Sequence, residues 1–137
     1  METQKKFEDL NLNPNLVKAI YLYGFKNPSS IQIKGIESIN TGKDCMLQSQ
    51  SGTGKTATYL LGVLNRIEEN NKLQGMIILP TRELAEQVYN VAKQISKSTK
   101  IKIELCMGGH RINYSNLFKS NLIIGTTGRI YHLIDDK

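Results

Sequence analysis

The feature that most constrains the fold is a glycine-rich loop, Ser-Gln-Ser-Gly-Thr-Gly-Lys-Thr, at residues 49–56. A short apolar run, Asp44–Gln48, precedes the loop and predicts a buried strand, and the amphipathic segment from about Lys55 to Asn70 predicts a helix. Between a strand and a helix, small residues let successive backbone N–H groups turn toward one anion. The segment therefore predicts a phosphate-binding loop.

Two side chains add chemistry to this loop. Lys55 can bring a positive charge to the β- and γ-phosphates of a nucleotide, and the Thr56 hydroxyl can be a ligand of Mg²⁺. The usual pattern begins with glycine where this chain has Ser49, but the Gly-Thr-Gly-Lys-Thr core is intact. The alternative is an ordinary Gly/Ser turn with a chance lysine. The nucleotide-binding residues predicted in the loop are Ser49, Gln50, Ser51, Gly52, Thr53, Gly54, Lys55 and Thr56.

Strand and helix patterns alternate along the rest of the chain. Further strands are predicted at Gly75–Leu79, Lys100–Met107 and Asn121–Gly125, and helices at Pro14–Tyr23, residues 28–40, Arg82–Ser96 and from Gly128 onward. Repeated strand-helix alternation is typical of an α/β protein whose parallel sheet has helices on both faces. A chain of 137 residues is near the size of one domain.

Composition narrows the protein class. With 39% apolar and 22% charged residues, the chain fits a soluble globular protein rather than a disordered one. No apolar stretch is long enough to span a membrane, so we expect a cytoplasmic or nuclear protein. The formal net charge of +6 favours an anionic partner. Cys45 and Cys106 lie in apolar runs without paired Cys/His spacing, which predicts buried, reduced thiols rather than zinc ligands.

Further motifs lie on both sides of the loop: Phe7 with Gly24-Phe25 and Pro28–Gln32, then Pro80–Ala85, Gly108–Gly109 and Thr126–Arg129. Together with the loop, these motifs resemble the N-terminal part of the DEAD-box RNA helicase family. The chain is most similar to the translation-initiation-factor-4A branch. The resemblance implies a RecA-like fold, with ATP and Mg²⁺ as ligands. Residues 1–40 would form an adenine-sensing segment, and residues 41–137 would form part of the ATP-binding domain.

The resemblance also implies how adenine is bound. In this family the glutamine of the first motif reads the base, which assigns adenine recognition to Gln32. A carboxamide donates and accepts at once, matching the N6 donor and N7 acceptor of adenine, and an aromatic ring such as that of Phe7 can stack on the base. The residue types alone favour Gln32 as a solvated helix residue and Phe7 as a core side chain.

The remaining motifs imply contacts to the backbone of one RNA strand. The RNA-binding residues implied are Pro80, Thr81, Arg82, Glu83, Gly108, Gly109, Thr126, Gly128 and Arg129. A capped helix start at residues 80–83 and a plain Gly-Gly turn are the alternatives. The family usually has proline where Thr127 stands, which leaves this helix start less preorganised. His110 and His132 match no motif and receive no role.

The Asp-Glu-Ala-Asp motif that names the family does not occur in the sequence. We therefore expect a RecA-like domain truncated before that motif, and we predict no catalytic residue. The favoured function is that of an ATP-dependent RNA helicase, an enzyme that unwinds RNA duplexes. A non-catalytic remnant that binds nucleotide or RNA is the alternative, and the Pro-Thr-Arg-Glu-Leu-Ala run disfavours an unrelated kinase or GTPase. Expected partners are RNA, bound without regard to sequence, and translation-initiation scaffold proteins, with no membrane.

Overall fold

The computed structural model describes residues 5–48, 54–108 and 114–135. The chain forms two compact units, one of residues 1–66 and 95–99 and the other of residues 67–94 and 100–137. The boundary expected after residue 40 falls inside the first unit, because the helices on either side of it pack together.

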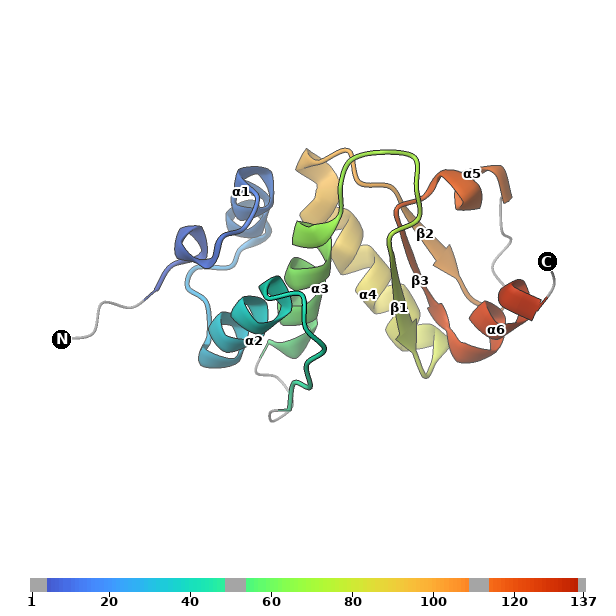
Figure 1. Cartoon of the computed structure of the whole chain (residues 1–137), viewed down its shortest axis with the longest axis horizontal. Coiled ribbons are helices and arrows are strands. Elements are labelled where there is room, and N and C mark those ends of the chain that lie inside the picture. Colours follow the sequence, from blue (N-terminus) through green and yellow to red (C-terminus); the bar gives the residue numbers. More distant parts are fainter. Residues whose placement is uncertain (1–4, 49–53, 109–113, 136–137) are drawn as a thin grey trace. The chain divides into compact units, whose positions relative to one another are not determined.

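Helices make up the first unit (Figure 1). They are η1 (Phe7–Leu10), α1 (Pro14–Tyr23), α2 (Ser30–Asn40), α3 (Lys55–Arg66) and η2 (Ser96–Ser98). The predicted bounds of α1 are confirmed: the Asn13 side chain accepts a hydrogen bond from the backbone N–H of Asn15 at 2.9 Å, and Gly24 ends the helix with φ 117°. Helix α3 is shorter than predicted, since it ends at Arg66 instead of Asn70.

Small residues let α2 and α3 approach closely. A Cβ atom on Gly35 of α2 would lie 2.3 Å from Cγ2 of Thr58, and one on Gly62 of α3 would lie 2.6 Å from Cδ1 of Ile39. Both distances are shorter than a carbon–carbon contact, so neither position has room for a side chain. The two glycines therefore set the separation of these helices.

The Asn65 side chain of α3 forms hydrogen bonds with the chain before α1 and with the end of α2. Its amide nitrogen donates to the backbone oxygen of Asn11 at 3.0 Å and to Oδ1 of Asn40 at 3.2 Å. Its amide oxygen accepts from the backbone N–H of Asn13 at 2.7 Å. A single carboxamide thus satisfies polar groups from two segments, the chain before α1 and the end of α2.

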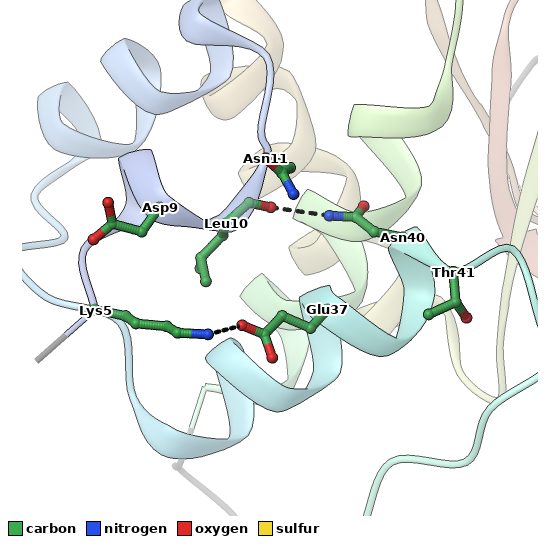
Figure 2. Close-up of a pocket in the computed structure, with 7 residues that line it drawn as sticks. All are labelled: Lys5, Asp9, Leu10, Asn11, Glu37, Asn40 and Thr41. Carbon is green, nitrogen blue, oxygen red and sulfur yellow. Dashed lines mark hydrogen bonds and ion pairs between the residues drawn. The ribbon is translucent and has the colours of Figure 1, made fainter. Parts of the chain in front are cut away.

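A polar pocket of about 390 Å³ lies beside η1 and the end of α2 (Figure 2). It is lined by Lys5, Asp9, Leu10, Asn11, Glu37, Asn40 and Thr41. Several of these groups bind each other: Asn40 Nδ2 donates to the backbone oxygen of Leu10 at 2.9 Å, and Lys5 pairs with Glu37. These contacts hold η1 on α2, and we assign the pocket no ligand.

The predicted strand Asp44–Gln48 is wrong. These residues form no strand, and Cys45 and Met46 are exposed, Met46 to 91%. A strand exists only through ladder bonds to a neighbour, and the strands of the described residues pair only with one another. The prediction of a buried Cys45 therefore also fails, whereas Cys106 is buried as predicted.

The second unit contains a parallel sheet with the strand order β1-β3-β2. Its elements are β1 (Gly75–Leu79), α4 (Arg82–Ile95), β2 (Ile103–Cys106), α5 (Tyr114–Lys119), β3 (Leu122–Thr126) and α6 (Thr127–Asp135). The connections β1-α4-β2 and β2-α5-β3 run in opposite directions along the sheet, so right-handed crossovers place α4 and α5 on opposite faces. Figure 1 shows this arrangement, with α6 on the α5 side. The predicted α/β architecture is confirmed, although α5 was not predicted.

The strand register separates two faces of the sheet. On the α5 and α6 face, Cys106 and Ile123 pack with Leu117 and Ile130 in one apolar cluster. Met76 and Ile78 of β1 lie on the same face as Ile123 by register, yet they are 41% and 51% exposed. In the described part of the chain β1 pairs with β3 alone, and an apolar face beside an open edge favours association.

A buried asparagine joins the start of the sheet to the loop before β1. Asn121 Oδ1 accepts from the backbone N–H of Lys102 at 2.9 Å. Its Nδ2 donates to the backbone oxygens of Asn70 at 2.7 Å and Lys72 at 3.0 Å. The side chain is 0% exposed, so these bonds replace the water that it loses on folding.

The two cysteines are expected to differ in reactivity. Burial raises the pKa of the Cys106 thiol to about 11, with a smaller contribution from the charge of Glu104, while Arg129 lowers it. A thiol reagent at pH 8 should therefore label Cys45 alone, and in urea it should label both. Because the unfolded thiol ionises near pH 9 and the folded one near 11, stability should fall as pH rises through this window. Rapid labelling of Cys106 in the folded chain would contradict this burial.

Candidate functional site

The end of the predicted phosphate-binding loop leads directly into α3. Residues 49–53, which contain Ser49, Gln50, Ser51, Gly52 and Thr53, lie outside the described part of the chain. Gly54 has φ 96°, a conformation that favours glycine, and its backbone oxygen accepts from the backbone N–H of Thr58 at 3.0 Å and from its hydroxyl at 2.8 Å. The loop therefore continues into the first turn of α3, where backbone N–H groups and the helix dipole favour an anion.

The structure brings Gln32 against this loop. Gln32 is 3% exposed, and its Oε1 accepts from the backbone N–H of Ser29 at 2.8 Å, while Ser29 Oγ accepts from the backbone N–H of Gln32 at 3.4 Å. A Cβ atom on Gly54 would lie 2.6 Å from Gln32 Nε2. The carboxamide is thus held by a capping box with its nitrogen beside the loop, and the alternative of a solvated helix residue is wrong.

Phe7 is a core side chain, so the prediction that it stacks on adenine is not supported. It is 0% exposed, and its ring makes edge contacts with Tyr21 at a centroid distance of 5.9 Å and with Phe25 at 6.4 Å. Both ring faces lie in protein rather than at a surface that a base could reach. The aromatic contacts instead position η1 against α1.

Lys55 and Thr56 occupy the first turn of α3. Thr56 is exposed, and Lys55 is partly exposed. One turn further on, burial raises the pKa of the half-buried Tyr59, and a hydrogen bond with the Thr56 side chain lowers it. Among the described residues no group of three or more His, Cys, Asp or Glu could hold a metal ion. A magnesium ion here would need oxygen ligands from bound phosphates in addition to Thr56.

A second candidate site lies in the sheet-containing unit. A pocket of about 320 Å³ is lined by Arg82, Gly108, Thr126, Gly128, Arg129 and His132. All but His132 are among the residues implied to bind RNA. They follow or end three different strands, and the carboxyl ends of parallel strands meet at one edge of a sheet. Topology thus gathers residues that are far apart in the sequence.

Other implied RNA-binding residues do not line this pocket. Pro80, Thr81 and Glu83 are exposed at the start of α4, and Gly109 lies outside the described residues. Thr81 Oγ1 accepts from the backbone N–H of Leu84 at 3.2 Å, so its side chain caps α4. The capping alternative therefore holds for Thr81, and its exposure leaves it open to a second contact.

Gly108 has a steric role in the pocket. A Cβ atom there would lie 2.6 Å from Nη2 and 3.2 Å from Cζ of Arg82, so the guanidinium occupies the space that a side chain would need. Gly128 has no atom within 4 Å of such a position. Gly108 therefore makes room for Arg82 directly, whereas the space beside Gly128 is open.

Two guanidinium groups give the pocket its charge. Arg129 stands in the first turn of α6, and its Nε is buried without a hydrogen-bond acceptor among the described residues. An unpaired buried donor is costly, and an anion in the pocket would supply the missing acceptor. Arg82 and Arg129 together with a helix N-terminus favour phosphate. Helix α6 begins at Thr127 even without the proline usual in the family.

No helix among residues 5–48, 54–108 and 114–135 is long and apolar enough to cross a membrane. His132 is the pocket residue that sequence reasoning missed. Its one sequence signal is the spacing of three residues from Arg129, which places both on one helix face.

The parallel sheet with helices on both faces defines an α/β protein of the RecA-like class. The chain is similar to Saccharomyces cerevisiae Dbp5 bound to RNA and ADP BeF3, with a TM-score of 0.85 and 34% identity over 96% of this chain and 34% of that one. Residues 29–137 match the DEAD/DEAH box helicase family, and the chain belongs to this family.

Two relatives show which members of the family the chain is similar to. The chain is 43% identical to the ATP-dependent RNA helicase eIF4A of Lodderomyces elongisporus, covering 95% of this chain and 34% of that protein. It is 41% identical to the ATP-dependent RNA helicase FAL1 of Candida albicans, covering 98% of this chain and 35% of that protein. The chain thus spans about a third of the length of these relatives.

Proposed function

We propose that this chain is the ATP-binding and RNA-binding part of an ATP-dependent RNA helicase that unwinds RNA duplexes. The observation that carries the proposal is the arginine pocket, where residues from three separate motifs meet at one sheet edge. The relatives named as ATP-dependent RNA helicases support it, and so does the similar Dbp5 structure that contains RNA and an ADP complex. We further propose translation-initiation scaffold proteins as partners and a cytoplasmic location.

The nucleotide site would act through charge and through one carboxamide. Lys55 and the N-terminus of α3 would neutralise the phosphates, and Gln32 would bind the adenine edge from its fixed position beside Gly54. Mg²⁺, when bound with ATP, would shield the phosphate charge and could take the Thr56 hydroxyl as a ligand. The residues of this chain therefore account for binding and orienting ATP.

The arginine pocket would bind the RNA backbone rather than the bases. Arg82 and Arg129 carry donors that suit phosphate oxygens, and among the described residues neither a carboxylate nor a carboxamide lines the pocket to read a base edge. Gly108 allows the Arg82 guanidinium to lie at the pocket wall. This chemistry suits an enzyme that acts on RNA of any sequence.

The test is binding of single-stranded RNA by the 137-residue chain. Oligonucleotides of equal length and different sequence should bind with equal Kd, and affinity should fall linearly in log–log form with salt because counterions are released. Arg82→Ala and Arg129→Ala should each raise the Kd of every oligonucleotide by about tenfold. Fluorescence anisotropy measures these constants.

Lys97→Ala, a change of one exposed basic residue in the first unit, is the matched control and should leave Kd nearly unchanged. A strong preference for one base sequence would overturn backbone recognition. Unchanged affinity in both arginine variants would show that the pocket is not the RNA site.

A further inference from the structure

His132 stands in the arginine pocket without an assigned role. It lines the same cavity of about 320 Å³ as Arg82 and Arg129. It lies on α6 three residues after Arg129, so the two side chains share a helix face. We propose that His132 is a third phosphate-binding side chain of this pocket and that its protonated imidazole donates to a backbone phosphate oxygen. The inference rests on the proposed RNA-binding function.

The charges around His132 favour an anion. The charged side chains that line the cavity with it are Arg82 from α4 and Arg129 from α6. The strands packed against α6, β1 and β3, carry no titratable side chain. In the described part of the chain, the other charged or titratable side chains of the helices and strands of this unit are not among the residues that line the cavity; they are Glu83, Glu86, Tyr89 and Lys93 of α4, Glu104 and Cys106 of β2, Tyr114 and Lys119 of α5, and Tyr131 and Asp135 of α6.

Protonation should be coupled to RNA binding. A neutral imidazole offers one N–H donor, whereas the protonated ring offers two donors and a positive charge, and histidine changes between these forms in the physiological pH range. A phosphate bound between the two guanidinium groups would add negative charge beside the ring, which favours the protonated form. RNA binding should therefore take up a proton and strengthen as pH falls.

The experiment measures Kd for an oligouridylate by fluorescence anisotropy between pH 5.5 and 8, at constant ionic strength. The unmodified chain should bind about tenfold more tightly at pH 5.5 than at pH 8, the lower end of the range for one charge-assisted hydrogen bond. His132→Gln should bind the oligouridylate with the same Kd at every pH between 5.5 and 8. His132→Lys, whose charge persists at both values, should bind tightly without pH dependence.

A matched control and a second readout separate the outcomes. Tyr131→Gln changes the adjacent residue, which is 70% exposed, and should keep the full pH dependence. At pH 5.5 the slope of log Kd against the logarithm of the salt concentration should be steeper for the unmodified chain than for His132→Gln. The expected difference is about 0.7, the value for one phosphate contact on single-stranded RNA.

Two results would overturn the inference: a pH-independent Kd in the unmodified chain, or an undiminished pH dependence in His132→Gln. If Arg82→Ala and Arg129→Ala still weaken binding at pH 8, the proposed function stands and the role of His132 alone is wrong. If neither arginine variant affects binding, the proposed function itself fails.

Discussion

Gly125→Ala is expected to lower the free energy of unfolding by about 3 kcal/mol or more, the upper range for an overpacked core. Gly125 of β3 pairs with Cys106 of β2, and an added Cβ atom would lie 2.2 Å from the Cys106 backbone oxygen and 3.1 Å from its Cβ. A flexible side chain could turn away from such a contact, but a backbone oxygen in the middle of a sheet cannot. The substitution should therefore separate β2 from β3.

The matched control is Gly128→Ala, three residues later. An added Cβ atom there meets no atom within 4 Å, and alanine is the better helix former in α6. This variant should be as stable as the unmodified chain or slightly more stable. Urea denaturation followed by circular dichroism gives both values, and a Gly125→Ala midpoint equal to that of Gly128→Ala would contradict the close strand contact.

Local signals in the sequence predicted the helices well. The bounds of α1 agree with the prediction because both ends depend on neighbouring residues: Asn13 and Pro14 begin the helix and Gly24 ends it. Apolar runs also located β1 and β3, although only β3 is central in the described sheet and buried along most of its length, whereas β1 lies at an edge with Met76 and Ile78 exposed. Helix α5 was missed because its short sequence, Tyr114–Lys119, contains too few turns to show a period.

Strand pairing could not be predicted from a local pattern. The run Asp44–Gln48 is as apolar at its centre as β1, yet it forms no strand and leaves Met46 exposed. An apolar run indicates which side chains avoid water, whereas a strand also needs a backbone partner that can lie far away in the sequence. For the same reason Cys45 is exposed although its neighbours predicted burial.

In the candidate site, too, local sequence signals identified single residues but not the contacts between them. Motifs identified Arg82, Gly108 and Arg129 individually, but the steric fit between Gly108 and Arg82 depends on the parallel strand order. His132 joins them because α6 starts at the carboxyl end of β3. Phe7 was assigned to a base by resemblance, whereas the structure has its ring between Tyr21 and Phe25 in the core.

Lys55→Ala should weaken binding of ATP and GTP by about 100-fold each. A charge-assisted contact to phosphate contributes up to about 3 kcal/mol, and the two nucleotides carry the same phosphates. Lys55 begins α3 next to Gly54, so the substitution removes the charge at the point where the helix N-terminus favours an anion. Competition of ATP and GTP against a fluorescent ATP analogue measures both constants.

Gln32→Ala should act on the base instead. Alanine removes both the oxygen that accepts from the backbone N–H of Ser29 at 2.8 Å and the amide donor beside Gly54. The unmodified chain should prefer ATP over GTP, since the carboxamide oxygen can accept from the adenine N6 amino group whereas guanine presents an acceptor at that position, and the preference should disappear in Gln32→Ala.

These two variants separate phosphate binding from base recognition. Lys55→Ala should lower both affinities and keep their ratio, whereas Gln32→Ala should bring the ratio of the two affinities close to one. Equal affinity of the unmodified chain for ATP and GTP would remove the adenine role from Gln32 and leave it as the cap of α2. Undiminished nucleotide binding in Lys55→Ala would show that the start of α3 does not hold phosphate.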